Sequence, residues 1–255
     1  MKIFLLCGGF GSRLDHEGKL KAKTMVKIGN KPILLHIIEN FNRQGFDQFV
    51  ICLGYKAETI LNYFLKNNKK NTKIISKNKN KIVLTFRKNN LKSKLHFIYT
   101  GINTGTAGRI KIAFNSLKLK EDILMTYGDG LSNLSIKKLI KFHYMKKSLV
   151  TITAVKPKQR YGILKIKNNK VLYFDNSKKK SDIYVNGGFH VIDKSAIKYI
   201  KNTRDYWEDK QLRRFKSIKK LFAFKHEGFW KSLDTLKDKN EFNEITKQKK
   251  LPWIR

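Results

Sequence analysis

The sequence indicates an α/β protein with a Rossmann-like, doubly wound and mostly parallel central sheet. In the first half of the chain, short apolar runs alternate with amphipathic stretches of helical period. A glycine-rich turn follows the first apolar run, where ligands bind in open parallel sheets. The second half is richer in closely spaced apolar runs, which predicts an antiparallel portion that builds out a pocket.

The elements follow from hydrophobic periodicity and from stop signals. In residues 31–45, Ile33, Ile37, Ile38 and Phe41 fall on one helical face, and Gly45 ends the pattern. The same reading predicts strands over residues 3–6, 48–54, 94–99 and 122–130, and further helices over residues 56–67, 106–118 and 135–147. Later strands are expected over residues 149–155, 161–166, 170–175, 184–192 and 221–226. Strands separated by helices of this length indicate βαβ units and a parallel sheet.

The 255-residue chain is expected to be a single domain, residues 1–255, because no repeat and no Pro/Gly/Ser-rich linker interrupts it. Within it, residues 66–94 form a lysine-rich stretch without glycine or proline, which we interpret as a solvated basic insertion or a contact arm. Residues 151–255 are expected to form the strand-rich second portion of this domain. No apolar stretch is long enough for a membrane span.

The two cysteines, Cys7 and Cys52, lie in apolar runs, so neither a disulfide framework nor a zinc site is implied, and a cytoplasmic location is expected. The net charge of +37 favours polyanionic ligands. Lysine dominates it, whereas proteins that read bases favour arginine, so a nucleic-acid partner is the weaker hypothesis.

The turn after the first apolar run holds Gly8, Gly9, Gly11, Ser12 and Arg13. Glycines let backbone N–H groups approach an anion closely, so this turn is a candidate phosphate cradle. It is neither a P-loop nor a complete dinucleotide-binding fingerprint, because the required spacings are absent. On its own, a tight structural turn explains it equally well.

The longer stretch "GGFGSRL…KAKTMVKIGNKPILLH" resembles the signature of the sugar-phosphate nucleotidyltransferases. The segments "LNYFL", "TYGDGLSNLSI", "YVNGGFHVI", "HEGFWKSLDTLKDKNEF" and "LPW" resemble that family in the same order. Within it, the chain is most similar to the glucose-1-phosphate cytidylyltransferases. The resemblance implies transfer of a nucleotidyl group from a nucleoside triphosphate, CTP in the first instance, to a sugar 1-phosphate such as glucose 1-phosphate.

That chemistry rests on positioning and electrostatics. By resemblance, Arg13 and Lys23 hold the phosphates and offset charge as pyrophosphate leaves. Asp129 in "YGDG" and Asp234 in "SLDT" match the family's Mg²⁺ ligands. Two carboxylates suffice for magnesium, which keeps several waters and binds phosphate oxygens. Against this reading, an aspartate between glycines is often only a turn former.

A second glycine-rich turn precedes the helix expected over residues 106–118. By resemblance it lies near the base and ribose and adds nucleotide-binding candidates: Thr104, Gly105, Thr106, Gly108 and Arg109. The cytidylyltransferases have T-G-G-R here, whereas this chain has Ala107. The identity of the base therefore stays open.

By resemblance, residues 151–255 form the sugar-phosphate-binding portion, with the candidate residues Asn186, Gly187, Trp230 and Lys178. The family carries an F-x-E-K-P stretch before its N-G-G-F, and its lysine is expected to bind the sugar's phosphate. This chain has Asn176 and Ser177 at the Glu and Lys positions, so Lys178 is the substitute. Another sugar phosphate such as a heptose, or nucleotide binding without turnover, stays open. Related enzymes assemble into oligomers, so a homo-oligomer is expected.

Overall fold

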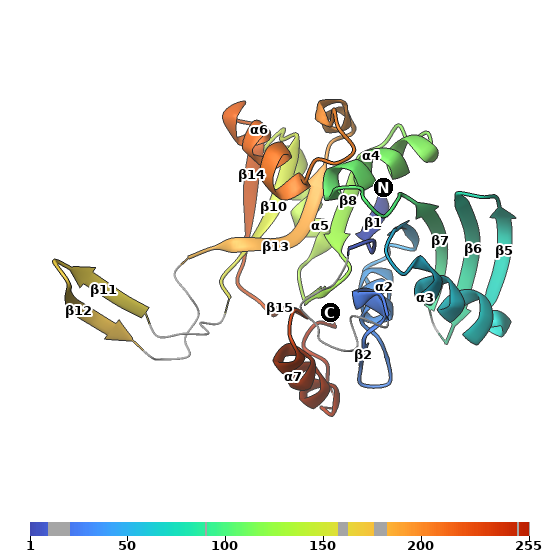
Figure 1. Cartoon of the computed structure of the whole chain (residues 1–255), viewed down its shortest axis with the longest axis horizontal. Coiled ribbons are helices and arrows are strands. Elements are labelled where there is room, and N and C mark those ends of the chain that lie inside the picture. Colours follow the sequence, from blue (N-terminus) through green and yellow to red (C-terminus); the bar gives the residue numbers. More distant parts are fainter. Residues whose placement is uncertain (10–20, 90, 158–162, 176–182, 249, 255) are drawn as a thin grey trace.

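The computed structural model describes residues 1–9, 21–89, 91–157, 163–175, 183–248 and 250–254. Its framework is a nine-stranded sheet with the order β14-β10-β13-β8-β1-β4-β7-β6-β5 (Figure 1). These strands are β1 (Lys2–Leu6), β4 (Gln48–Leu53), β5 (Thr72–Lys77), β6 (Lys81–Lys88), β7 (Leu91–Tyr99), β8 (Ile123–Tyr127), β10 (Val150–Val155), β13 (Val185–Ile192) and β14 (Leu221–His226).

The sheet is mixed, with a parallel centre. Strand β1 pairs in parallel with both β4 and β8, and β4 pairs in parallel with β7. Strand β13 runs antiparallel between β8 and β10, and β14 then pairs in parallel with β10. The expected α/β fold is therefore confirmed, and antiparallel strands flank its parallel core on both sides.

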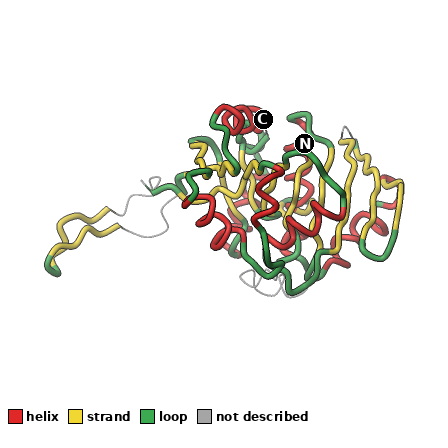
Figure 2. The backbone as a smooth tube through the Cα atoms, turned by 90° about the horizontal axis from the view of Figure 1, so that it is seen from above, coloured by secondary structure: helices red, strands yellow, loops and turns green. Residues whose placement is uncertain are grey.

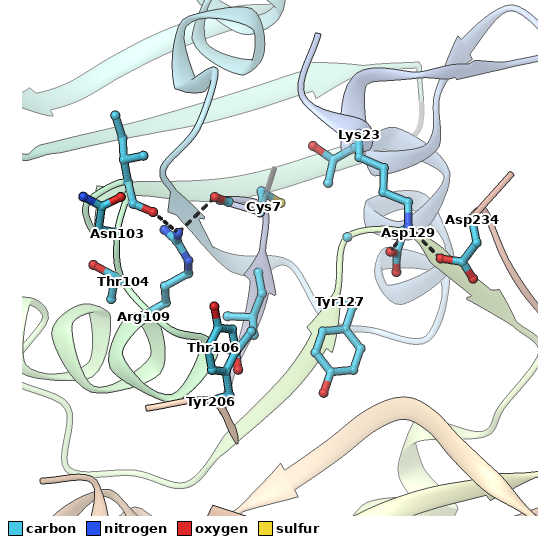
Figure 3. Close-up of a pocket in the computed structure, with 16 residues that line it drawn as sticks. Cys7, Lys23, Asn103, Thr104, Thr106, Arg109, Tyr127, Asp129, Tyr206 and Asp234 are labelled. Atoms are coloured by element: carbon cyan, nitrogen blue, oxygen red, sulfur yellow. Dashed lines mark hydrogen bonds and ion pairs between the residues drawn. The ribbon is translucent and has the colours of Figure 1, made fainter. Parts of the chain in front are cut away.

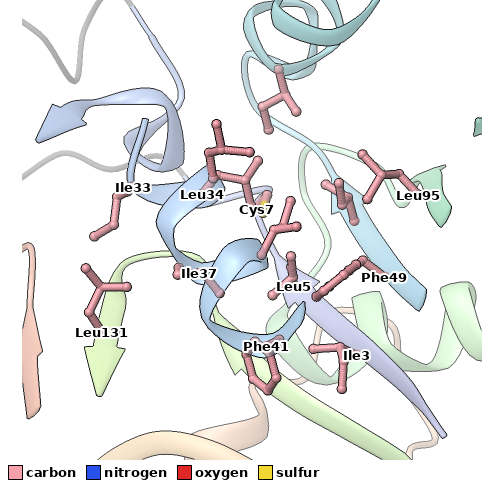
Figure 4. Close-up of a cluster of buried hydrophobic side chains, with 14 of the residues drawn as sticks. Ile3, Leu5, Cys7, Ile33, Leu34, Ile37, Phe41, Phe49, Leu95 and Leu131 are labelled. Carbon is pink, nitrogen blue, oxygen red and sulfur yellow. The ribbon is translucent and has the colours of Figure 1, made fainter. Parts of the chain in front are cut away.

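Helices cover both faces of the sheet because its buried strands carry apolar side chains on both faces. One face packs against α2 (Ile33–Arg43), α3 (Ala57–Asn62) and α5 (Ile136–Met145), and α7 (Leu236–Thr246) joins the same apolar cluster through Phe242. Figure 4 shows Phe41 and Ile37 of α2 against Leu5 and Phe49 of the sheet. The other face packs against α4 (Thr106–Ser116), the short helix η5 (Trp207–Gln211) and α6 (Leu212–Ser217).

Short elements complete the described part of the chain. These are the helical turns η1 (Lys23–Met25), η2 (Tyr63–Asn67), η3 (Lys69–Asn71) and η4 (Lys194–Tyr199), and the strands β2 (Lys27–Ile28), β3 (Lys31–Pro32), β9 (Gly130–Ser132) and β15 (Trp230–Ser232). Strands β2 and β3 pair with each other, as do β9 and β15. No helix among the described residues is long and apolar enough to cross a membrane.

The lysine-rich stretch at residues 66–94, expected to be a solvated insertion or a contact arm, contains regular structure. It contains the end of η2, all of η3, β5 and β6, and the start of β7, so it extends the central sheet to one edge. Leu84 and Phe86 of β6 are fully buried. Its lysines fit an edge strand, because charged side chains there discourage pairing with another sheet.

The expected strands at residues 161–166 and 170–175 also differ from the prediction. They form a separate hairpin of β11 (Ile163–Lys167) and β12 (Lys170–Asp175) and do not join the sheet. Figures 1 and 2 show this hairpin standing away from the rest of the molecule. The antiparallel portion of the sheet is therefore built by β10 and β13 alone on this side.

Candidate functional site

A cavity of about 580 Å³ opens where the parallel strands β1 and β8 end (Figure 3). Its walls come from the turn after β1, from η1, from the segment before α4 and from the turn after β8. The lining residues are Leu6, Cys7, Gly8, Gly9, Lys23, Thr24, Ile102, Asn103, Thr104, Thr106, Arg109, Tyr127, Gly128, Asp129, Tyr206 and Asp234. Gly8 and Gly9 therefore lie at the edge of the sheet where the sequence places a ligand.

Gly8 is required for close packing beneath this turn. A Cβ atom at Gly8 would lie 2.2 Å from Arg109 Nη1, so the guanidinium would have to shift. At Gly9, by contrast, a Cβ would meet no described atom within 4 Å. The lack of a side chain at Gly8 thus leaves room for the Arg109 guanidinium, whereas Gly9 lines the cavity.

Arg109 lines the cavity and is also held by the protein's own acceptors. Its guanidinium is buried and donates to the carbonyl oxygens of Gly8 (2.9 Å), Gly101 (2.7 Å) and Ile102 (3.1 Å) and to the Thr100 hydroxyl (2.8 Å). Burial lowers the pKa of this guanidinium relative to its ordinary value. Its donors are committed to the protein, so it ties the turn after β1 to the segment after β7.

Lys23 joins the two aspartates that the sequence singled out. Its Nζ lies 2.6 Å from Asp129 Oδ2 and 2.8 Å from Asp234 Oδ1 (Figure 3). All three side chains are partly buried at the cavity wall. Residues far apart in sequence thus form one compact charged cluster.

The pairing of β9 with β15 brings the two aspartates together. Asp129 directly precedes β9, and Asp234 lies after β15 with Leu233 between them. The Leu233 amide donates to the Asp129 carbonyl at 2.8 Å, which extends this ladder to the site. The Ser232 hydroxyl donates to Asp234 Oδ2 at 2.6 Å and orients that carboxylate.

The charges of this cluster stabilise one another. Burial alone would lower the pKa of Lys23, but the charge of Asp129 and hydrogen bonds to both aspartates outweigh it and raise that pKa. Burial would raise the pKa of Asp234, but hydrogen bonds from Lys23 and Ser232 bring it below its ordinary value. At neutral pH the cluster therefore holds an ammonium between carboxylates.

The glycines at the start of α4 pack closely against residues 203–205. A Cβ at Gly108 would lie 1.8 Å from the Thr203 carbonyl oxygen, and one at Gly105 would lie 2.2 Å from that of Asp205. The Gly105 amide also donates to the Thr203 carbonyl at 2.9 Å. Neither glycine lines the cavity, whereas Thr104 and Thr106 do.

The sugar-phosphate candidates meet beside Tyr127. The Trp230 indole N–H donates to the Gly187 carbonyl at 2.8 Å. Gly188 has φ +81°, and a Cβ there would lie 2.7 Å from the Tyr127 ring. Asn186, Gly187 and Trp230 therefore lie together beside Tyr127, which lines the cavity. Four other candidates, Gly11, Ser12, Arg13 and Lys178, lie outside the described residues.

The sequence profile of the nucleotidyl transferase family matches residues 2–246. The chain belongs to this family. Glucose-1-phosphate cytidylyltransferase of Salmonella typhimurium is 36% identical over 267 residues, covering 99% of this chain and 98% of the relative. D-glycero-alpha-D-manno-heptose 1-phosphate guanylyltransferase of Aneurinibacillus thermoaerophilus is 28% identical over 205 residues, covering 77% of this chain and 76% of the relative.

The crystal structure of HddC from Yersinia pseudotuberculosis has the same fold, with a TM-score of 0.70 at 24% identity, covering 95% of this chain and 98% of that chain. The resemblance to the sugar-phosphate nucleotidyltransferases is thereby confirmed, and the protein is an enzyme of this family. It is similar over its full length to enzymes that activate sugar phosphates.

In this nucleotidyl transferase, Asp129 and Asp234 fit the divalent metal typical of the family. Both carboxylates already converge on one cation, the Lys23 ammonium, at the wall of the cavity. No cluster of three or more acidic, histidine or cysteine ligands exists among the described residues. Magnesium needs only one or two carboxylates when phosphates and waters complete its shell.

Sequence reasoning missed Tyr127, Tyr206, Ile102 and Asn103 of the nucleotidyl transferase cavity. Tyr127 is the last residue of β8 and directly precedes the "GDG" turn, so its position in the sequence could have indicated a cavity residue. Tyr206 comes from a segment with no recognisable motif. Only the packing of that segment on α4 brings it to the cavity.

Proposed function

We propose that this protein transfers a cytidylyl group from CTP to glucose 1-phosphate, with release of pyrophosphate and formation of CDP-glucose. The full-length similarity to the Salmonella typhimurium cytidylyltransferase supports this substrate pair. The cluster of Lys23, Asp129 and Asp234 in the cavity is the structural observation that carries the proposal.

In the proposed reaction, a phosphate oxygen of the sugar phosphate attacks the α-phosphorus of CTP. The new P–O bond forms as the bond from the α-phosphorus to the bridging oxygen breaks, and that electron pair leaves with pyrophosphate. Backbone amides at Gly8 and Gly9 would bind the triphosphate, with Gly11, Ser12 and Arg13 continuing the same turn. Lys23 would offset the negative charge that develops on the leaving group.

Asp129 and Asp234 would hold Mg²⁺, which supplies electrostatic stabilisation of the phosphates when bound. Thr104 and Thr106 would face the nucleotide, while Gly105, Gly108 and Arg109 would shape that wall from behind. Asn186, Gly187 and Trp230 would form the sugar-phosphate side, and Lys178 would supply a positive charge for the sugar's phosphate.

The test is Mg²⁺-dependent pyrophosphate release from glucose 1-phosphate with ATP, GTP, CTP, UTP or dTTP. We expect release with CTP, and a loss on the order of 100-fold in Asp129→Asn, because the neutral amide binds a divalent cation poorly. Asp122→Asn is a matched control, since this aspartate lies away from the cavity, where Tyr144 and Lys194 donate to it. Equal rates in wild type and Asp129→Asn would contradict the proposed site.

The second candidate is transfer of another nucleotide to another sugar phosphate, such as guanylyl transfer to a heptose 1-phosphate. The guanylyltransferase relative supports it, as do Ala107, Asn176 and Ser177 at positions where the cytidylyltransferase pattern differs. Turnover with GTP and a heptose 1-phosphate, without turnover of CTP and glucose 1-phosphate, would favour this candidate.

The homo-oligomer and the cytoplasmic location stay predictions from the family resemblance. Light scattering after size-exclusion chromatography measures the mass in solution, for which the chain mass is 29.9 kDa. An observed mass of one chain at micromolar concentration would contradict the oligomer.

A further inference from the structure

A chain of hydrogen bonds runs behind the sugar-phosphate side of the cavity. It starts at Trp207, the first residue of η5, whose indole N–H donates to Nδ1 of His190 at 2.8 Å. The other ring nitrogen of His190, Nε2, lies 2.8 Å from Oδ1 of Asn186. Both Trp207 and His190 are completely buried.

The donors and acceptors of this chain allow only one arrangement. The indole nitrogen of Trp207 is only a donor, so Nδ1 of His190 must accept. A neutral imidazole then carries its proton on Nε2 and donates it to Asn186 Oδ1. Burial lowers the pKa of His190 to about 3, so the ring stays neutral in the working range of an enzyme.

Asn186 is held at its oxygen by a second donor. The Gly188 amide donates to the same Oδ1 at 2.9 Å, so the carboxamide cannot be turned over without losing two hydrogen bonds. The amide nitrogen is therefore the end of Asn186 that is left for other partners.

The Asn186 carboxamide lies beside a residue of the cavity wall. Strand β13 pairs Phe189 with Thr126 of β8, so its start lies at the sheet edge where Tyr127 and Asp129 follow. Asn186 and Glu208 are the polar neighbours of the buried Tyr127 hydroxyl, and Tyr127 lines the cavity. Asn186 thus reaches the cavity wall at Tyr127.

We propose that His190 and Trp207 are positioning residues, which orient the Asn186 amide nitrogen toward the sugar-phosphate side of the cavity. This inference rests on the proposed function for the identity of the ligand. It assigns a role to a fully buried histidine of β13.

The link also reaches the nucleotide side. The backbone N–H of Trp207 donates to the Thr106 hydroxyl at 2.7 Å, and that hydroxyl donates to Glu208 at 2.6 Å. Thr106 lines the cavity at the start of α4. Trp207 thus holds Thr106 through its backbone N–H and Asn186 through its indole and His190. A substitution of the Trp207 side chain removes only the second of these contacts.

The first measurement is the histidine tautomer in the wild-type protein labelled with ¹⁵N. We expect His190 to show a proton on Nε2 alone from pH 8 to pH 5, with a coupling across the hydrogen bond to the Trp207 indole nitrogen. A proton on Nδ1, a mixture of tautomers, or titration near the ordinary pKa of histidine would overturn the proposal.

The second measurement compares Trp207→Phe with Phe215→Leu. The phenylalanine keeps an aromatic ring but removes the donor, whereas Phe215 packs on the Trp207 ring at 5.8 Å without joining the hydrogen-bond chain. We expect Trp207→Phe to raise KM for glucose 1-phosphate about tenfold, the effect of one misdirected hydrogen bond, and to leave KM for CTP within twofold. Equal changes in both KM values, or the same pattern in Phe215→Leu, would overturn the positioning role.

The two proposals fail in different ways. If the wild type releases no pyrophosphate with any substrate pair, the proposed function is wrong. The tautomer of His190 then decides the positioning role alone, because that measurement needs no turnover.

Discussion

At the residue scale, the site depends on charges that hold one another in place. Lys23 contacts both Asp129 and Asp234, so the residue expected to bind phosphate is paired with the residues expected to bind the metal. A divalent cation must displace this ammonium before it binds both carboxylates. The sequence identifies all three residues through family motifs but contains no sign of this competition.

Replacing Lys23 should therefore strengthen metal binding while it weakens catalysis. We expect Lys23→Met to bind Mn²⁺ about tenfold more tightly than the wild type, because the carboxylates lose their internal cation. Electron paramagnetic resonance of free Mn²⁺ measures this affinity without turnover. Lys27→Met, which removes an exposed lysine of β2, is the control. Unchanged or weaker Mn²⁺ binding in Lys23→Met would show that the two cations do not compete.

At the element scale, the packing of α4 against residues 203–205 shapes the cavity. Its first turn packs on residues 203–205, and Gly105 and Gly108 permit this contact. Arg109 then extends from the same turn beneath Gly8. The glycines that resemble a nucleotide-binding motif thus act mainly between elements of the protein.

This interpretation distinguishes two glycine substitutions. We expect Gly108→Ala to lower the free energy of unfolding by about 1–3 kcal/mol, because the new methyl group meets a backbone carbonyl. Gly9→Ala, whose Cβ meets no described atom, should leave stability near that of the wild type and raise KM for the nucleotide. Urea unfolding and steady-state kinetics measure both effects. Wild-type stability in Gly108→Ala would refute the packing role.

At the scale of the whole molecule, buried neutral histidines make the fold sensitive to acid. Burial lowers the pKa of His36 and His96 to about 4 and that of His190 to about 3. Their ordinary value, which the unfolded chain shows, is about 6.5. Between these values the unfolded state binds more protons, so acid favours unfolding.

The free energy of unfolding should therefore fall as the pH drops below about 6.5, by up to about 1.4 kcal/mol per pH unit for each of these histidines. Urea unfolding followed by tryptophan fluorescence at pH 7.5 and 5.5 measures the change. His96→Leu should reduce it, since both ring nitrogens of His96 are buried without partners among the described residues. An unchanged pH dependence in His96→Leu would contradict the assignment to this residue.

Hydrophobic periodicity was sufficient to predict the order of most strands and helices, because a residue's neighbours along the chain decide it. It was not sufficient for β5 and β6, since their lysines make edge strands resemble a solvated segment. Periodicity also could not place β11 and β12 outside the sheet, because strand pairing depends on contacts between residues that are far apart in the sequence.

The site also combines features that the sequence predicts with features that only tertiary contacts create. The glycine-rich turn, Lys23, Asp129 and Asp234 are visible in the sequence because their motifs are local. Only the pairing of β9 with β15 brings the aspartates to one ammonium, and only the folded chain shows that the buried Arg109 guanidinium donates to the Gly8 carbonyl. Motifs record residue type and spacing, whereas direction, burial and hydrogen-bond partners arise when distant segments pack together.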